Sequence, residues 1–191
     1  WNDDTLRSSL EDNETTDSSS LTFHNLGDAV ALNLFFSLRL NNSTHNLIEL
    51  NLSNCQLSAS SIAQLSPHPT LQKLYLQDNH LGDDGTELLA SNNNWSPNVT
   101  LLNVARNRIG NVGAAALAER MMMPSNCNLR KLYVYENNIG DLGAEAFSVS
   151  CSKLYELYIW DNDYSEIGLS YLWSNKHDKL LLKTEGASTK L

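Results

Sequence analysis

Four aromatic residues in the second half of the chain are spaced as a binding surface would require. Tyr133 and Tyr135 are separated by one residue, and so are Tyr158 and Trp160 in a later, similar segment. In a β-strand, side chains two positions apart lie on the same face of the sheet. Exposed tyrosine and tryptophan side chains are typical anchors of protein interfaces. The pattern therefore predicts recognition of a protein partner, with these rings as the anchors.

Charged residues follow both aromatic pairs and extend the predicted surface. Glu136 comes directly after Tyr135, and Asp161 comes directly after Trp160. This border favours a partner segment that presents Lys or Arg among apolar groups, because a cation can contact both aromatic faces and carboxylates. The predicted partner-binding residues are Tyr75, Arg106, Tyr133, Tyr135, Glu136, Tyr155, Tyr158, Trp160 and Asp161.

The other reactive residue types form no catalytic or metal-binding set. The five histidines share no metal-ligand spacing. No nucleophile–base pair or glycine-rich phosphate loop appears at a usable spacing. Cys55, Cys127 and Cys151 are too few and too scattered for a disulfide framework, so we expect packed, reduced thiols. We predict a non-enzymatic protein without a metal or other cofactor.

Repeated segments must position the aromatic pairs. Each segment has the pattern LxxLxLxxNxL, which predicts a short strand that ends in a turn, and a helical segment follows most of them. A strand and a helix that recur together predict a solenoid, in which each unit contacts mainly its neighbours. The apolar positions should face the core, and the positions between them should face outward in columns. The segments begin at Leu47, Leu71, Val99, Leu129 and Leu154.

An asparagine recurs at the turn that ends each strand, and we predict that it is structural. Its amide can bond both ways to the backbone of adjacent repeats and so form a ladder. Cys55 takes the same position with a weaker donor. The predicted ladder consists of Asn79, Asn107, Asn137 and Asn162.

Glycine and acidic or amide residues recur where the predicted helices begin. Gly85, Gly113 and Gly143 occupy one repeat position, which predicts a tight turn and a close approach between helix and strand. An Asp or Asn lies just before each helix. We expect its oxygen to accept hydrogen bonds from the unpaired amides of the helix that it precedes.

The repeats resemble a known family. LIELNLSNCQL, followed by LQKLYLQDNHLGDDGTELLA, is similar to the ribonuclease-inhibitor subtype of leucine-rich repeats, and so is PSNCNLRKLYVYENNIGDLGAEAF. That subtype alternates Cys and Asn at the turn, as Cys55 and Asn79 do here, although the later repeats carry only Asn. It also forms the sensor end of NOD-like receptors. The resemblance covers about residues 47–175 and implies an α/β leucine-rich repeat solenoid. A curved parallel sheet would lie on its concave side and helices on its convex side, with about five full repeats between degenerate caps.

Composition divides the chain into a tail and one repeat domain. Residues 1–20 are acidic and poor in apolar residues, so we expect a disordered tail or a cap segment. The repeat domain takes up residues 21–191. We divide it into a degenerate N-terminal repeat (21–46), full repeats (47–164) and a C-terminal cap (165–191) with a final strand near 179–183.

Charge and targeting signals limit the partners that we expect. The net charge is -9, and no basic stripe suits nucleic acid or an anionic membrane. The start is neither a signal peptide nor an initiator Met, so we expect a processed product or a fragment of a longer parent. We predict a cytoplasmic monomer. A secreted protein is the alternative, because Asn-x-Ser/Thr acceptors occur at Asn13, Asn41, Asn42, Asn51, Asn94 and Asn98.

Two functions other than a simple interaction module stay open. Residues 105–110 (ARNRIG) resemble a stretch of the GTPase-activating proteins that serve the nuclear-transport GTPase, which use the same repeat subtype. That resemblance implies a GTPase-activating or other regulatory protein. The likeness to NOD-like receptors implies the ligand-sensing fragment of a larger innate-immune-type receptor.

Overall fold

The computed structural model describes residues 19–27, 46–65, 68–91, 96–123 and 127–185. Within them, short strands alternate with helices along the chain. The elements are β1 (Ser20–Thr22), β2 (Glu49–Asn51), α3 (Ala59–Ile62), β3 (Lys73–Tyr75), α4 (Gly82–Ala90), β4 (Leu101–Asn103), α5 (Asn111–Met122), β5 (Lys131–Tyr133), α6 (Asp141–Ser150), the 3-10 helix η2 (Cys151–Lys153), β6 (Glu156–Tyr158), α7 (Glu166–Ser174) and β7 (Leu181–Lys183).

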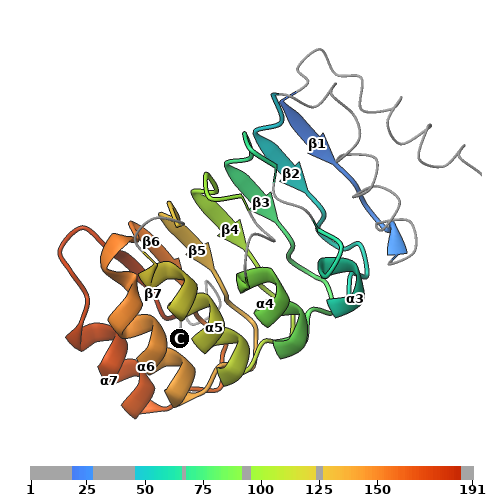
Figure 1. Ribbon diagram of the computed structural model, residues 1–191. Coiled ribbons are helices and arrows are strands. Elements are labelled where there is room, and N and C mark those ends of the chain that lie inside the picture. Colours follow the sequence, from blue (N-terminus) through green and yellow to red (C-terminus); the bar gives the residue numbers. More distant parts are fainter. Residues whose placement is uncertain (1–18, 28–45, 66–67, 92–95, 124–126, 186–191) are drawn as a thin grey trace, which may run out of the picture.

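The described strands form one parallel sheet of seven strands, ordered β1 to β7 as in the chain. Figure 1 shows the strands side by side along one flank of the molecule and the helices along the other. Each strand pairs in register with the equivalent strand of the next repeat, as Leu50 pairs with Leu74 and Leu74 with Leu102. The predicted solenoid of strand–helix repeats is therefore confirmed.

The apolar positions of the repeat form the core between the sheet and the helices. Leu74 and Leu102, at the middle of their strands, are completely buried. Leu76 and Val104, two residues further on, are also completely buried, as the alternation along a strand requires. Each such side chain stabilises the fold by about 1.5–3 kcal/mol relative to leaving it in water. The core is thus continuous along the solenoid axis.

The asparagine ladder is confirmed, with one refinement. Asn137 Oδ1 accepts hydrogen bonds from the N–H groups of Asn107 (2.8 Å) and Ile109 (3.0 Å) in the preceding repeat. Its Nδ2 donates to the carbonyls of Val104 (3.1 Å), also in that repeat, and Val134 (2.9 Å) in its own. Each ladder side chain therefore bonds to the preceding repeat and not to the following one. In this way it links its own turn to the turn before.

Cys55 occupies the first position of this ladder. Its Sγ lies 3.3 Å from the carbonyl oxygen of Phe23, as an asparagine amide would. The thiol is completely buried, and burial raises its pKa. Cys127 and Cys151 are also buried, and all three cysteines are free thiols.

A second ladder joins the starts of the helices, and here the prediction of local capping is wrong. Asp83 does not cap α4, in which it lies; its Oδ1 accepts hydrogen bonds from Gly110 N (2.7 Å) and Gly113 N (2.8 Å) at the start of α5. Gly110 is the N-cap residue of α5 and has no side chain to do this. Asn111 caps α6 in the same way, and Asp141 caps α7. The starts of α5, α6 and α7 are therefore each capped by the repeat before, whereas α3 has a local cap from Ser58, and Ser165 adds a local cap to α7.

The recurring glycine is required by this close approach. A Cβ atom on Gly113 would lie 2.8 Å from Asp83 Oδ1 and 2.8 Å from Ile109 Cγ2. A Cβ atom on Gly143 would lie 2.6 Å from Ile139 Cγ2 in its own repeat and 3.0 Å from Asn111 Oδ1 in the preceding one. Real Cβ atoms do not approach other atoms so closely, so any larger residue would push consecutive repeats apart.

Both ends of the sheet contain strands that the sequence suggested. β1 pairs with β2, and Ser19 O accepts from Ile48 N and Glu49 N, so the sheet takes in the last residues of the predicted tail. β7 is the expected final strand and pairs with β6. The rest of the predicted tail, and residues 28–45 of the predicted degenerate N-terminal repeat, lie outside the described residues. No helix among the described residues has both the length and the hydrophobicity to cross a membrane.

Replacing Asn107 with Ala should destabilise the protein. The change removes the acceptor for Leu81 N and the donor to Leu76 O, both in the preceding repeat. Each buried backbone group left without a partner costs about 1–3 kcal/mol. We expect a clear fall in the midpoint of thermal unfolding. Asn138→Ala, which removes an exposed side chain next to the ladder, is the control; equal midpoints for the two variants would refute the structural role.

The cap formed by Asp141 should make stability depend on pH. Hydrogen bonds from Ser165 N, Ser165 Oγ and Gly168 N hold the pKa of the Asp141 carboxyl below its ordinary value. A group whose pKa is lowered on folding contributes stability above its unfolded pKa, near 3.8, and this contribution is lost as pH falls through the folded value. Asp141→Asn should therefore lose less stability than wild type between about pH 7 and pH 2.5.

Urea unfolding at both pH values measures this difference. Asn111 performs the same capping in the preceding repeat, so the amide should be tolerated at position 141. Asp84→Asn removes an exposed carboxylate from α4 and serves as the control. If Asp84→Asn changes the pH dependence as much as Asp141→Asn does, the cap is not its cause.

Candidate partner-binding site on the open sheet face

The face of the sheet turned away from the helices carries the predicted binding residues, and we call it the open sheet face. Register places Tyr75, Asn103, Tyr133 and Tyr158 side by side in one column of this face. Lys183 on β7 continues the same column. The predicted column is therefore confirmed as an arrangement, whereas its role in binding stays a prediction.

The four anchor rings stack in pairs between neighbouring strands. Tyr133 and Tyr158 have ring centroids 4.6 Å apart with planes inclined by 19°. Tyr135 and Trp160 are 4.2 Å apart and nearly parallel, at 5°. Parallel strands lie about 4.8 Å apart, which is close to the stacking distance of aromatic rings. The rings consequently cover one another's faces along the solenoid axis.

Cations of the same chain cover further ring faces. Lys183 Nζ lies 4.7 Å from the ring centroid of Tyr158, and Arg106 Cζ lies 5.8 Å from that of Tyr135. Both distances fall within the range of a cation–π contact. Lys183 is a site residue that sequence reasoning missed; its place in the column follows once the 181–183 segment is aligned as a further strand.

Arg106 is held by carboxylates on both sides. Its Nε and Nη2 donate to Glu136 Oε2 and Oε1, both at 2.7 Å, and its Nη1 lies 3.6 Å from Asp78 Oδ1. The hydrogen bonds from Arg106 lower the pKa of Glu136, and the same pair raises the pKa of Arg106. All three residues have positive φ, between 53° and 59°, because the chain turns sharply where each strand ends. The pair is exposed, so it orients the side chains more than it stabilises the fold.

Glu156 links the rim of the site to the aromatic stack. Its Oε2 accepts from the hydroxyl of Tyr133 (2.7 Å), and its Oε1 lies 2.6 Å from Lys131 Nζ. Burial alone would raise the pKa of Glu156, but the hydrogen bonds from Lys131 and Tyr133 outweigh it and leave the pKa lowered. Burial, followed by the bond to Glu156, raises the pKa of Tyr133. The Tyr133 phenol therefore stays protonated and holds its ring in the stack.

Trp160, the last ring of the cluster, is followed by an acidic residue that no described residue neutralises. Asp161 follows Trp160, is exposed, and forms no ion pair with any residue in the described part of the chain. Burial, with the charges of Asp161 and Glu185, raises the pKa of Tyr164 to about 12. Negative charge therefore remains available at this end of the open sheet face.

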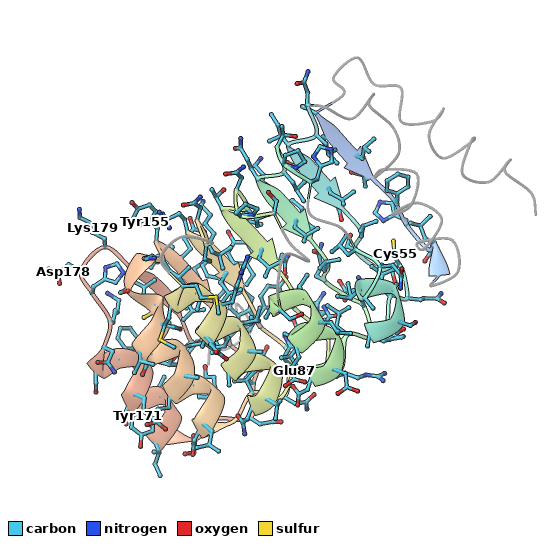
Figure 2. The ribbon with its side chains drawn as sticks, viewed as in Figure 1. Cys55, Glu87, Tyr155, Tyr171, Asp178 and Lys179 are labelled. Carbon is cyan, nitrogen blue, oxygen red and sulfur yellow. The ribbon has the colours of Figure 1, made fainter. Side chains whose placement is uncertain are left out.

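Two predicted residues lie apart from this cluster. Asn103 separates Tyr75 from Tyr133 in their column, so Tyr75 does not join the stack. Tyr155 is 53% exposed but precedes β6, and its position alternates with that of Glu156 on the open sheet face. Figure 2 shows Tyr155 at the C-terminal end of the solenoid, and Tyr171 on the side of the helices. Tyr155 is therefore a rim residue at most.

Two other kinds of site, a metal site and a glycosylation site, concern the described residues. Among them, no group of three or more His, Cys, Asp or Glu side chains could hold a metal ion. Of the glycosylation acceptors, Asn51 lies partly buried on β2 and Asn98 is exposed before β4, while the other four lie outside the described residues.

Comparisons with known proteins agree with the architecture. The Leucine Rich repeat family model matches residues 68–90, 96–118 and 125–148, and a second Leucine Rich Repeat model matches residues 46–67. No curated protein matches the chain.

Among solved structures, the chain is similar to the leucine-rich repeat ectodomain of the plant membrane receptor kinase GASSHO1/SCHENGEN3 from Arabidopsis thaliana, in complex with CASPARIAN STRIP INTEGRITY FACTOR 2. The identity is 16% and the TM-score 0.40, over 87% of this chain and 21% of that one. It is also similar to TLR13 in its complex with ssRNA13, at 14% identity and a TM-score of 0.28, over 86% of this chain and 32% of TLR13. The chain thus spans at most about a third of these proteins, and at such scores their ligands do not transfer to it.

The pairing of Arg106 with Glu136 can be tested by titration. In wild type, the pKa of Glu136 should lie below its ordinary value because Arg106 donates two hydrogen bonds to it. Arg106→Gln should raise that pKa, as measured from the carboxylate carbon shift by NMR. Arg108→Gln, which removes an exposed arginine two residues along the chain, is the control. An unchanged pKa for Glu136 in Arg106→Gln would mean that the ion pair does not form in solution.

Proposed function

We propose that this leucine-rich repeat protein is a non-enzymatic interaction module that binds a protein partner on its open sheet face. Repeat solenoids of this kind generally provide extended binding surfaces. The observation that carries the proposal is the pair of aromatic stacks, Tyr133 with Tyr158 and Tyr135 with Trp160, which are partly exposed on that face.

The stacking determines how a partner would meet these rings. Since neighbouring rings and the two cations cover ring faces, a partner contacts mainly ring edges and hydroxyl groups. Rings already held in place lose little conformational entropy on binding, which favours affinity. A partner cation is directed to the acidic end near Asp161, because Glu136 and Glu156 are already bound by Arg106 and Lys131.

We further propose the finer identity that the sequence suggested. The helices that follow β3, β4 and β5, and the pair Cys55 and Asn79 at the turn, support the ribonuclease-inhibitor-like subtype. The acidic border of the open sheet face supports a partner other than nucleic acid or an anionic membrane. Three free, buried thiols support a reducing, cytoplasmic setting. A monomer remains the proposed state.

The geometry around Arg106 does not support the alternative of a GTPase-activating protein. An arginine that stabilises a transferring phosphoryl group must reach the nucleotide with its guanidinium. Arg106, in the segment that suggested this function, has its guanidinium bound to Glu136 and next to Asp78. The receptor-fragment alternative concerns the parent protein, and it would use the same open sheet face.

Panning a display library of random dodecapeptides on the wild-type protein tests the proposed function. We expect the selected peptides to carry Lys or Arg beside apolar residues. Trp160→Ala should weaken their binding by about 2 kcal/mol, or roughly 30-fold, because truncating an interface anchor typically costs this much. Binding is measured by calorimetry after circular dichroism has confirmed that the variant is folded.

Two variants serve as controls for the location of the site. Lys73→Ala removes a rim cation that is paired with Glu49, and should have a much smaller effect. Leu142→Ala removes a 69% exposed side chain from α6 on the opposite side of the molecule. If Leu142→Ala abolishes binding and Trp160→Ala leaves it intact, the partner binds the helices and the proposal fails.

A further inference from the structure

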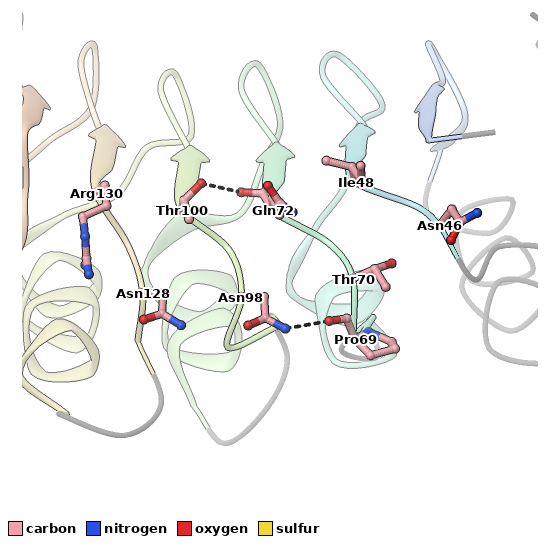
Figure 3. A pocket seen from close by; sticks show the side chains of 9 residues that line it. All are labelled: Asn46, Ile48, Pro69, Thr70, Gln72, Asn98, Thr100, Asn128 and Arg130. Carbon is pink, nitrogen blue, oxygen red and sulfur yellow. Dashed lines mark hydrogen bonds between the residues drawn. The ribbon is translucent and has the colours of Figure 1, made fainter. Parts of the chain in front are cut away.

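A groove of about 670 Å³ lies where the chain enters strands β2 to β5. Figure 3 shows its lining residues on the loops that lead into these strands. Arg106 and Glu136 follow β4 and β5, so the groove lies at the opposite ends of the strands from that ion pair. It is therefore separate from the aromatic cluster of the open sheet face.

The groove is lined mainly by two rows of polar side chains, and each row comes from one equivalent position in successive repeats. One row precedes the first buried apolar residue of each repeat and includes Thr70, Asn98 and Asn128. The other row follows that residue and includes Gln72, Thr100 and Arg130. None of the described residues that line the groove is acidic, although the whole chain has a net charge of -9.

The two asparagines are fixed in position by the preceding repeats. Asn98 Nδ2 donates to the carbonyl of Pro69 at 2.7 Å, and Asn128 Nδ2 donates to that of Pro97 at 3.1 Å. Each amide nitrogen has a second N–H, and neither Oδ1 takes part in a hydrogen bond within the described part of the chain. A side-chain amide that offers one donor and one acceptor matches the C=O and N–H of a peptide unit.

Arg130 provides the charge of the groove. Its Nη1 donates to the carbonyl of Leu129 at 2.9 Å, and its guanidinium forms no ion pair with any described residue. By contrast, Lys73, Lys131 and Arg106 on the open sheet face are all paired with carboxylates. Arg130 is half-buried, which strengthens its attraction for a carboxylate that can accept two hydrogen bonds.

We propose that this groove binds an extended peptide segment that carries an acidic side chain. Asn98 and Asn128 bind its main chain, and Arg130 binds its carboxylate. A peptide fits better than a saccharide because none of the described residues that line the groove has an aromatic ring for a sugar to stack on. The bound segment runs from repeat to repeat along the groove, so consecutive repeats contact consecutive parts of the peptide.

Titration with defined peptide pools, followed by NMR, tests this site. The probe is a pool of capped heptapeptides with Glu fixed at the fourth position and the other positions randomised, and the comparison pool has Gln there. We expect the Glu pool to shift the backbone amides of Thr100 and Arg130 and the side-chain amides of Asn98 and Asn128. The Gln pool should bind at least about tenfold more weakly, because a charge-assisted pair is lost.

Variants separate the roles of the groove residues. Arg130→Gln should remove the preference for the Glu pool, whereas Asn98→Ala with Asn128→Ala should weaken both pools; urea unfolding confirms that these variants remain folded. Arg108→Gln, which removes an exposed arginine outside both the groove and the aromatic cluster, should bind like wild type. Equal binding of the Glu pool by wild type and Arg130→Gln would overturn the proposal. Shifts produced by oligosaccharides of glucuronic acid, but not by either peptide pool, would also overturn it.

Discussion

The structure depends on satisfying the backbone at the turn that ends each strand. In a stack of parallel repeats these turns are buried, and their N–H and C=O groups have no neighbouring strand to bond with. Asn79, Asn107 and Asn137 solve this with one amide each, which accepts and donates at the same time. Because each amide reaches the preceding repeat, it also fixes the distance between repeats. The strand register, the aromatic stacks and the groove all follow from that distance.

A common spacing between repeats orders the side chains of the open sheet face. Strands about 4.8 Å apart bring equivalent side chains to the separation at which aromatic rings stack and ions pair. Tyr135 stacks on Trp160, and Lys131 pairs with Glu156, across the same two strands. Many aromatic and charged side chains of this face are therefore already in contact with one another. The proposed partner would therefore meet ring edges and the acidic charge of Asp161, which forms no ion pair with a described residue.

The two ends of the strands present opposite charge. Acidic groups predominate where strands end, because Arg106 is flanked by Asp78 and Glu136 and Asp161 has no partner among the described residues. The loops that lead into the strands carry amides and Arg130, which forms no ion pair with any described residue. A partner that contacts both regions would need positive charge at the acidic end and negative charge near Arg130. Such a requirement fixes the partner's orientation more than it adds affinity. The scaffold therefore offers two distinct surfaces with one set of repeats.

The sequence by itself determined the repeat, the buried apolar columns, the turn asparagines and the outward columns that bring Tyr133 beside Tyr158. These features follow from periodicity, since the same local pattern must take the same local conformation in each unit. Tertiary structure alone decided that Asp83 caps the following helix and not its own, that Arg106 and Lys183 cover aromatic rings, and that Asn98, Asn128 and Arg130 form a groove. Each of these is a contact between repeats. The repeats differ in length, and the offset between facing side chains depends on how neighbouring units are stacked in space, which spacing along the chain does not encode.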